Sequence, residues 1–162
     1  MVVQSRETGA PRLDLGHLGL FLGLRVNELV MEKLRAAGFG HVRESHGYVV
    51  QHLIERERSI TELAERMEVT QQAASKVVAE LAGLGVVELE AGEDRRAKRV
   101  RLTARAWESV RVARRARRGI EKRLARAVGE GRYAEACSVV GACLEALGGM
   151  GRVKARRVRA PG

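Results

Sequence analysis

Residues Ser59 to Glu88, SITELAERMEVTQQAASKVVAELAGLGVVE, decide the fold of this chain. Ser59 followed three positions later by Glu62 is a capping box, in which each side chain satisfies a free backbone N–H at the start of a helix. We therefore expect a short helix from Ile60. The hydroxyl of Thr70 can cap a second helix soon afterwards. The stretch predicts two helices joined by a tight turn.

The second of these helices has one apolar and one polar face. We expect Ala74, Val77, Val78 and Leu81 to be buried. Glutamine can pair with adenine, serine can bond to a phosphate or a base, and lysine meets phosphate or guanine. A helix in a major groove presents its N-terminal end to base edges. The outward residues of its first two turns are Gln71, Gln72, Ser75 and Lys76. An ordinary solvated polar face is the alternative.

Two short strands, 84–90 and 98–103, are predicted next, joined by a turn at 91–97. The turn and the second strand crowd five basic side chains into seven residues, although like charges repel. A hairpin beside a helix in a major groove lies near the adjacent minor groove, where arginine is favoured. The crowded residues are Arg95, Arg96, Lys98, Arg99 and Arg101.

Helices are predicted on both sides of this central part, at 15–37, 43–55, 103–128 and 133–147. The first is apolar on too many faces for a lone surface helix, because Leu20, Phe21 and Leu24 add to the stripe that includes Leu18 and Leu22. Burial against a second chain is the simplest explanation, and a deep position within the same chain is the alternative. The last helix is expected to serve packing or dimerisation.

The composition favours a folded, mainly helical protein with a polyanionic partner. The chain has 162 residues, is 45% hydrophobic and 3% aromatic, and carries a formal net charge of +10. A GC-rich coding sequence would also enrich arginine, so the position of the charge carries more weight than its amount. Basic residues concentrate in 102–128 and in the terminal 151–162.

Other classes of protein find little support in the sequence. No apolar run is long enough to span a bilayer and no signal peptide is evident, so we expect a cytoplasmic protein. Cys137 and Cys143 stand six apart and are expected to stay reduced. The four histidines lack a metal-binding pattern. Without a phosphate loop, a nucleophile elbow or paired carboxylates, we expect no enzyme, no cofactor and no metal.

The order of these elements, and three stretches in particular, resemble the MarR family of bacterial transcription regulators. The stretches are residues 38–53, 59–88 and 93–103, the last containing Asp94-x-Arg96. The resemblance covers about 39–105. It implies a mainly α fold with a small β-hairpin wing, that is, a winged helix-turn-helix with N- and C-terminal dimerisation helices. Three departures are Glu68 in place of a glycine, a wing about one residue short, and Ala106 in place of another glycine.

The resemblance also implies a domain layout. Residues 1–14 would be disordered and 15–148 would form one domain. Within it, a DNA-binding lobe at about 40–103 would lie between dimerisation helices at about 15–37 and 104–148. Residues 149–162 would form a basic flexible tail.

By the same resemblance, the chain is a homodimer that binds a pseudo-palindromic operator in double-stranded DNA, typically as a repressor. The helix from Thr70 to Leu84 would be the recognition helix. Arg95 and Arg96 would lie on the wing with Asp94 orienting an arginine, and many relatives release DNA when a small, often phenolic, molecule binds. The expected DNA-binding residues are Thr70, Gln71, Gln72, Ser75, Lys76, Asp94, Arg95, Arg96, Lys98 and Arg99. The expected effector-pocket residues are Phe21, Arg25, His46 and Val50.

A different kind of binding protein remains open at this point. A basic winged-helix module could contact RNA, the ribosome or a partner protein without operator specificity. Sequence-specific binding to its own promoter DNA in the presence of competitor would distinguish the two functions.

Overall fold

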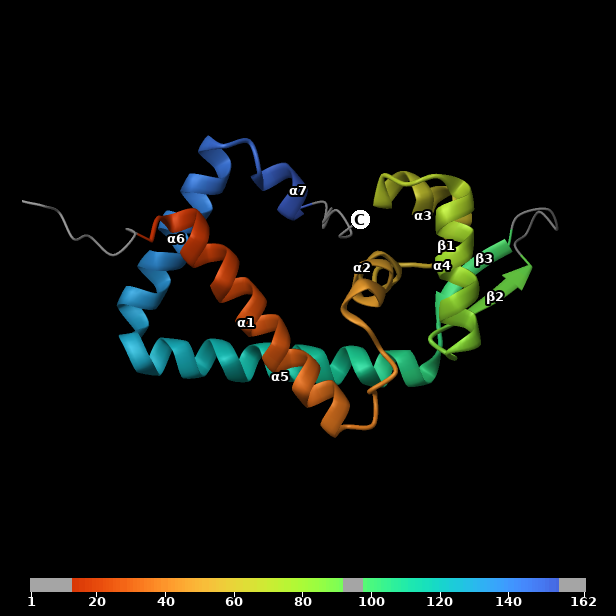
Figure 1. Ribbon diagram of the computed structural model, residues 1–162, viewed down its shortest axis with the longest axis horizontal. Coiled ribbons are helices and arrows are strands. Elements are labelled where there is room, and N and C mark those ends of the chain that lie inside the picture. Colours follow the sequence, from red (N-terminus) through yellow and green to blue (C-terminus); the bar gives the residue numbers. More distant parts are fainter. Residues whose placement is uncertain (1–12, 92–97, 155–162) are drawn as a thin grey trace, which may run out of the picture.

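The computed structural model describes residues 13–91 and 98–154, which form a winged-helix lobe joined by one long helix to a helical end (Figure 1). The described elements, in chain order, are α1 (Leu15–Ala36), α2 (Glu44–Leu53), β1 (Arg58–Ser59), α3 (Ile60–Met67), α4 (Gln71–Gly83), β2 (Val87–Ala91), β3 (Lys98–Leu102), α5 (Ala104–Val128), α6 (Glu130–Ala146) and α7 (Met150–Lys154). The predicted class, mainly α with a small β-hairpin, is confirmed.

The winged-helix lobe consists of α2, α3, α4 and the sheet around one apolar core. Leu63 of α3, Leu81 of α4 and Val100 of β3 are fully buried in it. Strands β2 and β3 pair antiparallel with Val87 opposite Leu102 and Leu89 opposite Val100. Alternation along β3 turns Val100 and Leu102 inward, so the hairpin is fixed to the helices through its root.

The predicted helix starts of the lobe are confirmed. Ser59 Oγ accepts from the Glu62 backbone N–H at 3.1 Å, and Glu62 Oε2 accepts from the Ser59 N–H at 2.7 Å. Thr70 Oγ1 accepts from the Ala73 N–H at 3.1 Å. These caps satisfy backbone donors that would otherwise be free and so fix where α3 and α4 begin.

The turn between α3 and α4 requires a left-handed residue. Glu68 has φ 56° and ψ 40°, and its N–H donates to Ala64 and Glu65 carbonyls. It occupies the position where the family resemblance led us to expect a glycine. A side chain in this conformation costs about 1 kcal/mol or somewhat more, which the buried faces of α3 and α4 offset.

The third strand, β1, was not predicted from the sequence. It pairs with β3, giving the order β1-β3-β2, with Arg58 opposite Val100. Two residues are too few to show an alternating pattern, and a charged residue at a buried strand position gave no signal. The Arg58 side chain is nevertheless buried, and its Nε donates to the His52 carbonyl at 2.7 Å.

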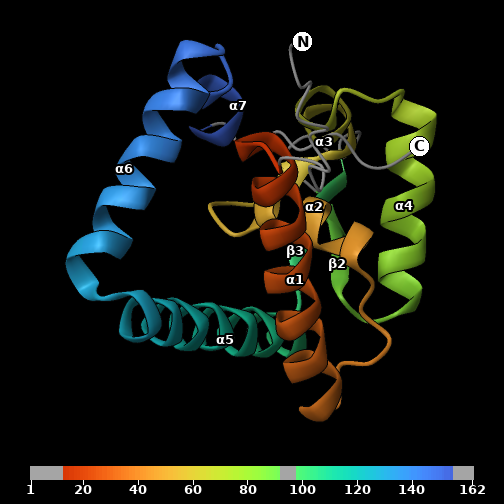
Figure 2. The same ribbon diagram turned by 60° about the vertical axis from the view of Figure 1, so that its left-hand side comes forward.

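A second, smaller core joins the C-terminal half of α1 to the middle of α5. Val30, Leu34, Phe39 and Val42 are buried there, with Ala116 and Ile120 of α5 packed against them. In both views α1 crosses α5 at an angle, while α6 and α7 lie on the side of the molecule away from α4 (Figure 2).

The two ends of the chain differ from expectation in several ways. Helix α6 starts at Glu130, earlier than predicted, and none of its described residues is buried. Val128 of α5 is likewise half exposed. The predicted flexible tail from 149 begins with α7, and Asp14, assigned to a disordered end, caps α1 by accepting from the His17 N–H at 2.9 Å. The apolar pattern of α6 was recognised, but one chain offers nothing to cover it.

No helix within 13–91 and 98–154 has the length and apolar character needed to cross a membrane.

Candidate nucleic-acid interface

Helix α4 presents its polar face to solvent at its N-terminal end, as predicted. Gln71, Gln72, Ser75 and Lys76 are exposed, whereas Ala74, Val78 and Leu81 on the opposite face are fully buried. Since the buried face holds the helix rigidly on the lobe, the polar side chains start from a fixed backbone. Thr70 is also exposed, but its hydroxyl serves the cap.

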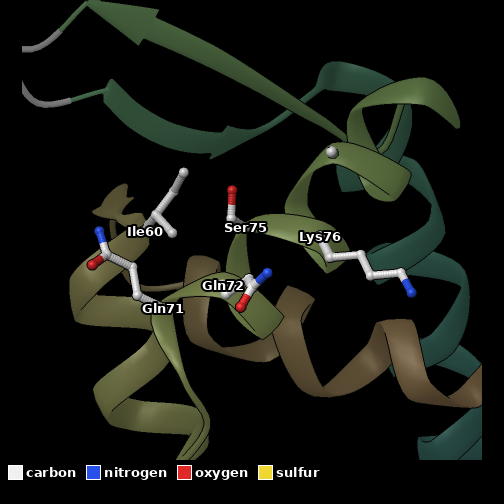
Figure 3. A pocket seen from close by; sticks show the side chains of 6 residues that line it. Ile60, Gln71, Gln72, Ser75 and Lys76 are labelled. Carbon is white, nitrogen blue, oxygen red and sulfur yellow. The ribbon is translucent and has the colours of Figure 1, made fainter.

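A shallow depression of about 550 Å³ lies along this polar face (Figure 3). It joins the start of α3 to the first three turns of α4. Its lining residues are Ile60, Gln71, Gln72, Ser75, Lys76 and Ala79. Gln71 is oriented by a hydrogen bond from its Nε2 to Thr61 Oγ1 at 3.4 Å. Ile60 and Ala79 were not predicted. Ile60 borders the depression because of how α3 crosses α4, whereas Ala79 lies one turn after Ser75 on the same face of α4.

The charge at the outer end of this face is neutralised from within the lobe. Glu80 forms an ion pair with Arg43, and its Oε1 lies 3.5 Å from Nε2 of the buried His46. Burial, together with the positive charge of Arg43, lowers the pKa of His46, which favours the neutral ring. The α4 surface therefore combines polar groups and a lysine without an uncompensated carboxylate at Glu80.

The described basic residues of the hairpin differ in what holds them. Lys98 is exposed, whereas Arg99 Nη1 lies 3.0 Å from Glu62 Oε2. Arg101 is paired with Glu88, at 2.9 Å, and with Glu90. Arg99 and Arg101 are thus partly neutralised, and Arg99 ties β3 to the start of α3. Asp94, Arg95 and Arg96 lie outside the described residues.

Glu62 is the centre of this connection. Besides capping α3 and binding Arg99, it accepts from Arg56 Nη2 at 2.6 Å. The backbone hydrogen bond from Ser59 and the interactions with Arg56 lower the pKa of Glu62 to about 2, so the carboxylate stays charged through the neutral range. The capping box identified Glu62 in the sequence, but its pairing with Arg99, 37 positions away, required the fold.

The four residues expected to form an effector pocket lie in unlike surroundings. Phe21 and Arg25 are exposed on α1, where Arg25 Nη1 binds Glu28 at 2.8 Å. His46 is buried on α2, and Val50 is half-buried against the core of the lobe. The two pairs therefore belong to different helices, one pair facing solvent and the other packed within the lobe.

The part of the chain that contains the depression and the hairpin is similar in sequence to a known protein family. The model of the MarR family matches residues 44–97, which span α2 to the wing. This part of the chain, about a third of its length, is similar to the MarR family. No curated protein sequence matches the chain closely enough to count as a relative.

Solved structures share the fold of this chain over most of its length. RV1404 from Mycobacterium tuberculosis superposes with a TM-score of 0.71 at 16% identity, covering 85% of this chain and 97% of that one. MepR, a transcription regulator of the Staphylococcus aureus multidrug efflux pump MepA, gives 0.66 at 14%, covering 83% and 99%. YusO from Bacillus subtilis gives 0.62 at 19%, covering 83% and 99%. The winged-helix arrangement of MarR-family transcription regulators is thereby confirmed.

Proposed function

We propose that this chain is a sequence-specific DNA-binding transcriptional regulator that acts as a homodimer on a pseudo-palindromic operator and represses a nearby gene. One observation carries the proposal. The exposed polar groups in the first turns of α4, among them Gln72, Ser75 and Lys76, lie on a rigid helix whose lobe also holds the β2–β3 hairpin. This is the arrangement in which a helix enters a major groove while a wing approaches the neighbouring minor groove.

A MarR-fold structure with bound nucleic acid supports the choice of partner. A MepR variant bound to an oligodeoxyribonucleotide superposes on this chain with a TM-score of 0.55 at 16% identity, covering 83% of this chain and 99% of that one. We transfer from it only the class of ligand. The individual contacts of this chain, including those of Arg95, Arg96 and Lys98 on the wing, are part of the proposal.

Homodimerisation is proposed because the helical end exposes apolar side chains that a single chain leaves in water. The N-terminal half of α1 and the C-terminal half of α6, with the residue that follows it, carry most of them, and contiguous apolar surface of this kind marks interaction sites. A twofold dimer would bring two lobes to successive turns of a duplex. The exposed residues are Leu15, Leu18, Leu20, Phe21, Leu22, Leu24, Val139, Val140, Leu144 and Leu147.

The proposal also includes release of DNA by a small, phenolic effector near Phe21, Arg25, His46 and Val50. Its support is the family resemblance. The test is displacement of bound operator by a panel of phenols and phenolic acids, repeated with His46→Ala and with His41→Ala as the control. Displacement that both variants retain unchanged would remove His46 from the pocket.

Operator binding is tested with genomic fragments from the chain's own promoter region in excess competitor DNA. We expect Gln72→Ala and Ser75→Ala to lower the preference for operator over unrelated DNA. We expect Arg96→Ala to weaken binding to all DNA and to reduce the slope of log affinity against log salt by about one for each phosphate interaction that is removed. Ser45→Ala and Arg111→Ala, exposed on α2 and α5, are the matched controls.

Two results would contradict the proposal. Unchanged operator affinity in all three interface variants would separate α4 and the wing from DNA binding. Equal affinity for every nucleic acid, RNA included, would instead favour a basic winged-helix module that binds RNA, the ribosome or a protein partner. Because the net charge of +10 favours binding to any nucleic acid, RNA and unrelated DNA are the competitors that the assay must include.

A further inference from the structure

The depression beside α4 combines amide groups with aliphatic surface. Gln71 and Gln72 supply two side-chain amides, whereas the side chains of Ile60 and Ala79 are purely aliphatic. Lys76 is the one cation among the six lining residues, and none of the six is acidic. Such a surface is suited to the edges of base pairs and poorly suited to phosphate alone.

Ile60 holds a fixed position in this depression. It is the first residue of α3, and the capping box formed by Ser59 and Glu62 fixes the backbone at this point. Its side chain is half-buried and packs on the core of the lobe, yet it also borders the depression. In Figure 3 it lies between Gln71 and Ser75. Core packing accounts for its buried part and leaves an aliphatic edge among polar groups.

The major-groove edge of an A·T pair matches this combination. Adenine offers the N7 acceptor and the N6 donor to a glutamine amide, and thymine adds a C5-methyl group that favours apolar contact. A G·C pair is bound best by arginine or by lysine, of which the depression has only Lys76. We infer that the depression recognises A·T pairs, with Ile60 contacting the C5-methyl of a thymine and Gln72 or Gln71 binding the neighbouring adenine. This inference rests on the proposed function.

The thymine methyl can be tested without changing the protein. An operator is first selected by the full chain from random duplex DNA, and each thymine is then replaced singly by deoxyuridine, which lacks only the methyl group. We expect one thymine per half-site at which the replacement weakens binding about fourfold, the effect of exposing one buried methyl group. The neighbouring adenine is then replaced by 7-deazaadenine, which lacks the N7 acceptor. This replacement should weaken binding by the wild type. It should have little effect on whichever variant, Gln72→Ala or Gln71→Ala, has lost the contact with that adenine.

The protein variants then assign the methyl contact to Ile60. We expect Ile60→Ala to bind the thymine and deoxyuridine operators equally, and Ile60→Val to retain part of the difference. The control is Ile54→Ala, because Ile54 packs on the same core but does not line this depression. It should lose comparable stability while keeping the fourfold difference. Circular dichroism establishes that each variant is folded at the assay temperature.

The outcomes separate this inference from the proposed function. Failure of the selection to yield any consensus would refute the proposed function and the inference with it. A clear consensus without a methyl-sensitive thymine would refute the inference alone. Full deoxyuridine sensitivity in Ile60→Ala would also refute it, because another side chain would then hold the methyl group.

Discussion

Removing two leucines from the exposed stripe of α1 should separate the proposed dimer. Leu18 and Leu22 lie one turn apart and are 51% and 54% exposed in the single chain. Complete burial of a leucine contributes about 2 kcal/mol, so covering the remaining half contributes about 1 kcal/mol for each side chain. A twofold dimer covers four such leucines, which amounts to about 4 kcal/mol. Because alanine keeps one carbon, we expect the dissociation constant of Leu18→Ala/Leu22→Ala to rise roughly 100- to 1,000-fold.

Analytical ultracentrifugation over a range of concentrations measures this change directly. The control is Leu89→Ala, since Leu89 is also an exposed leucine, at 39%, but lies on β2 in the winged-helix lobe. It should leave the dissociation constant unchanged. A double variant that dimerises within threefold of the wild type would show that this part of α1 is not in the interface. A wild-type chain that stays monomeric at about 10 μM would refute the estimated contribution of these leucines, since a chain with an interface this apolar should be dimeric at that concentration.

Three further predictions concern the lobe and its stability. Glu68→Gly should raise the free energy of unfolding by about 0.5 to 1 kcal/mol in urea titrations, because glycine adopts φ 56° without the Cβ penalty. Glu68→Ala keeps the Cβ, so an equal gain in stability in that variant would contradict this cause. Arg58→Ala should lower the free energy of unfolding by about 3 kcal/mol, since it removes a buried side chain and leaves the His52 carbonyl without the Arg58 donor. The control Arg101→Ala removes an exposed arginine and should cost at most about 1 kcal/mol. Equal losses in the two variants would place Arg58 at the surface. Because the pKa of Glu62 is lowered from 4.5 to about 2, its contribution to folding stability is complete above about pH 4.5 and is lost as the pH falls towards 2. Glu62→Gln should therefore lose less stability than the wild type over this pH range. An unchanged pH profile of the melting temperature in this variant would exclude Glu62 as the source of the acid sensitivity.

The sequence by itself determined the local structure of the lobe. The capping box at Ser59, the Thr70 cap and the buried stripe through Ala74 and Leu81 are patterns within a few residues of one another, and each was confirmed. The outward face of α4 followed from the same periodicity. Helix caps and amphipathic stripes can be predicted because they depend on neighbours three or four positions away.

Contacts between distant segments were decided only by the tertiary structure. The Glu62 to Arg99 ion pair, the third strand with its buried Arg58, and the entry of Ile60 into the depression depend on how α3, α4 and β3 are placed in space. No local pattern encodes those separations. Arg99 therefore looked like a free phosphate ligand in the sequence, although it also connects the wing to α3.

The helical end also separates what the sequence predicts from what the tertiary structure decides. Apolar periodicity correctly placed α1 and α6, but it could not say what covers them, and in the single chain no described residue of α6 is buried. The C-terminal half of α1 found a partner in α5, whereas its N-terminal half did not. A hydrophobic stripe requires burial without specifying the surface that provides it, because the hydrophobic effect is non-directional and depends only on the area removed from water.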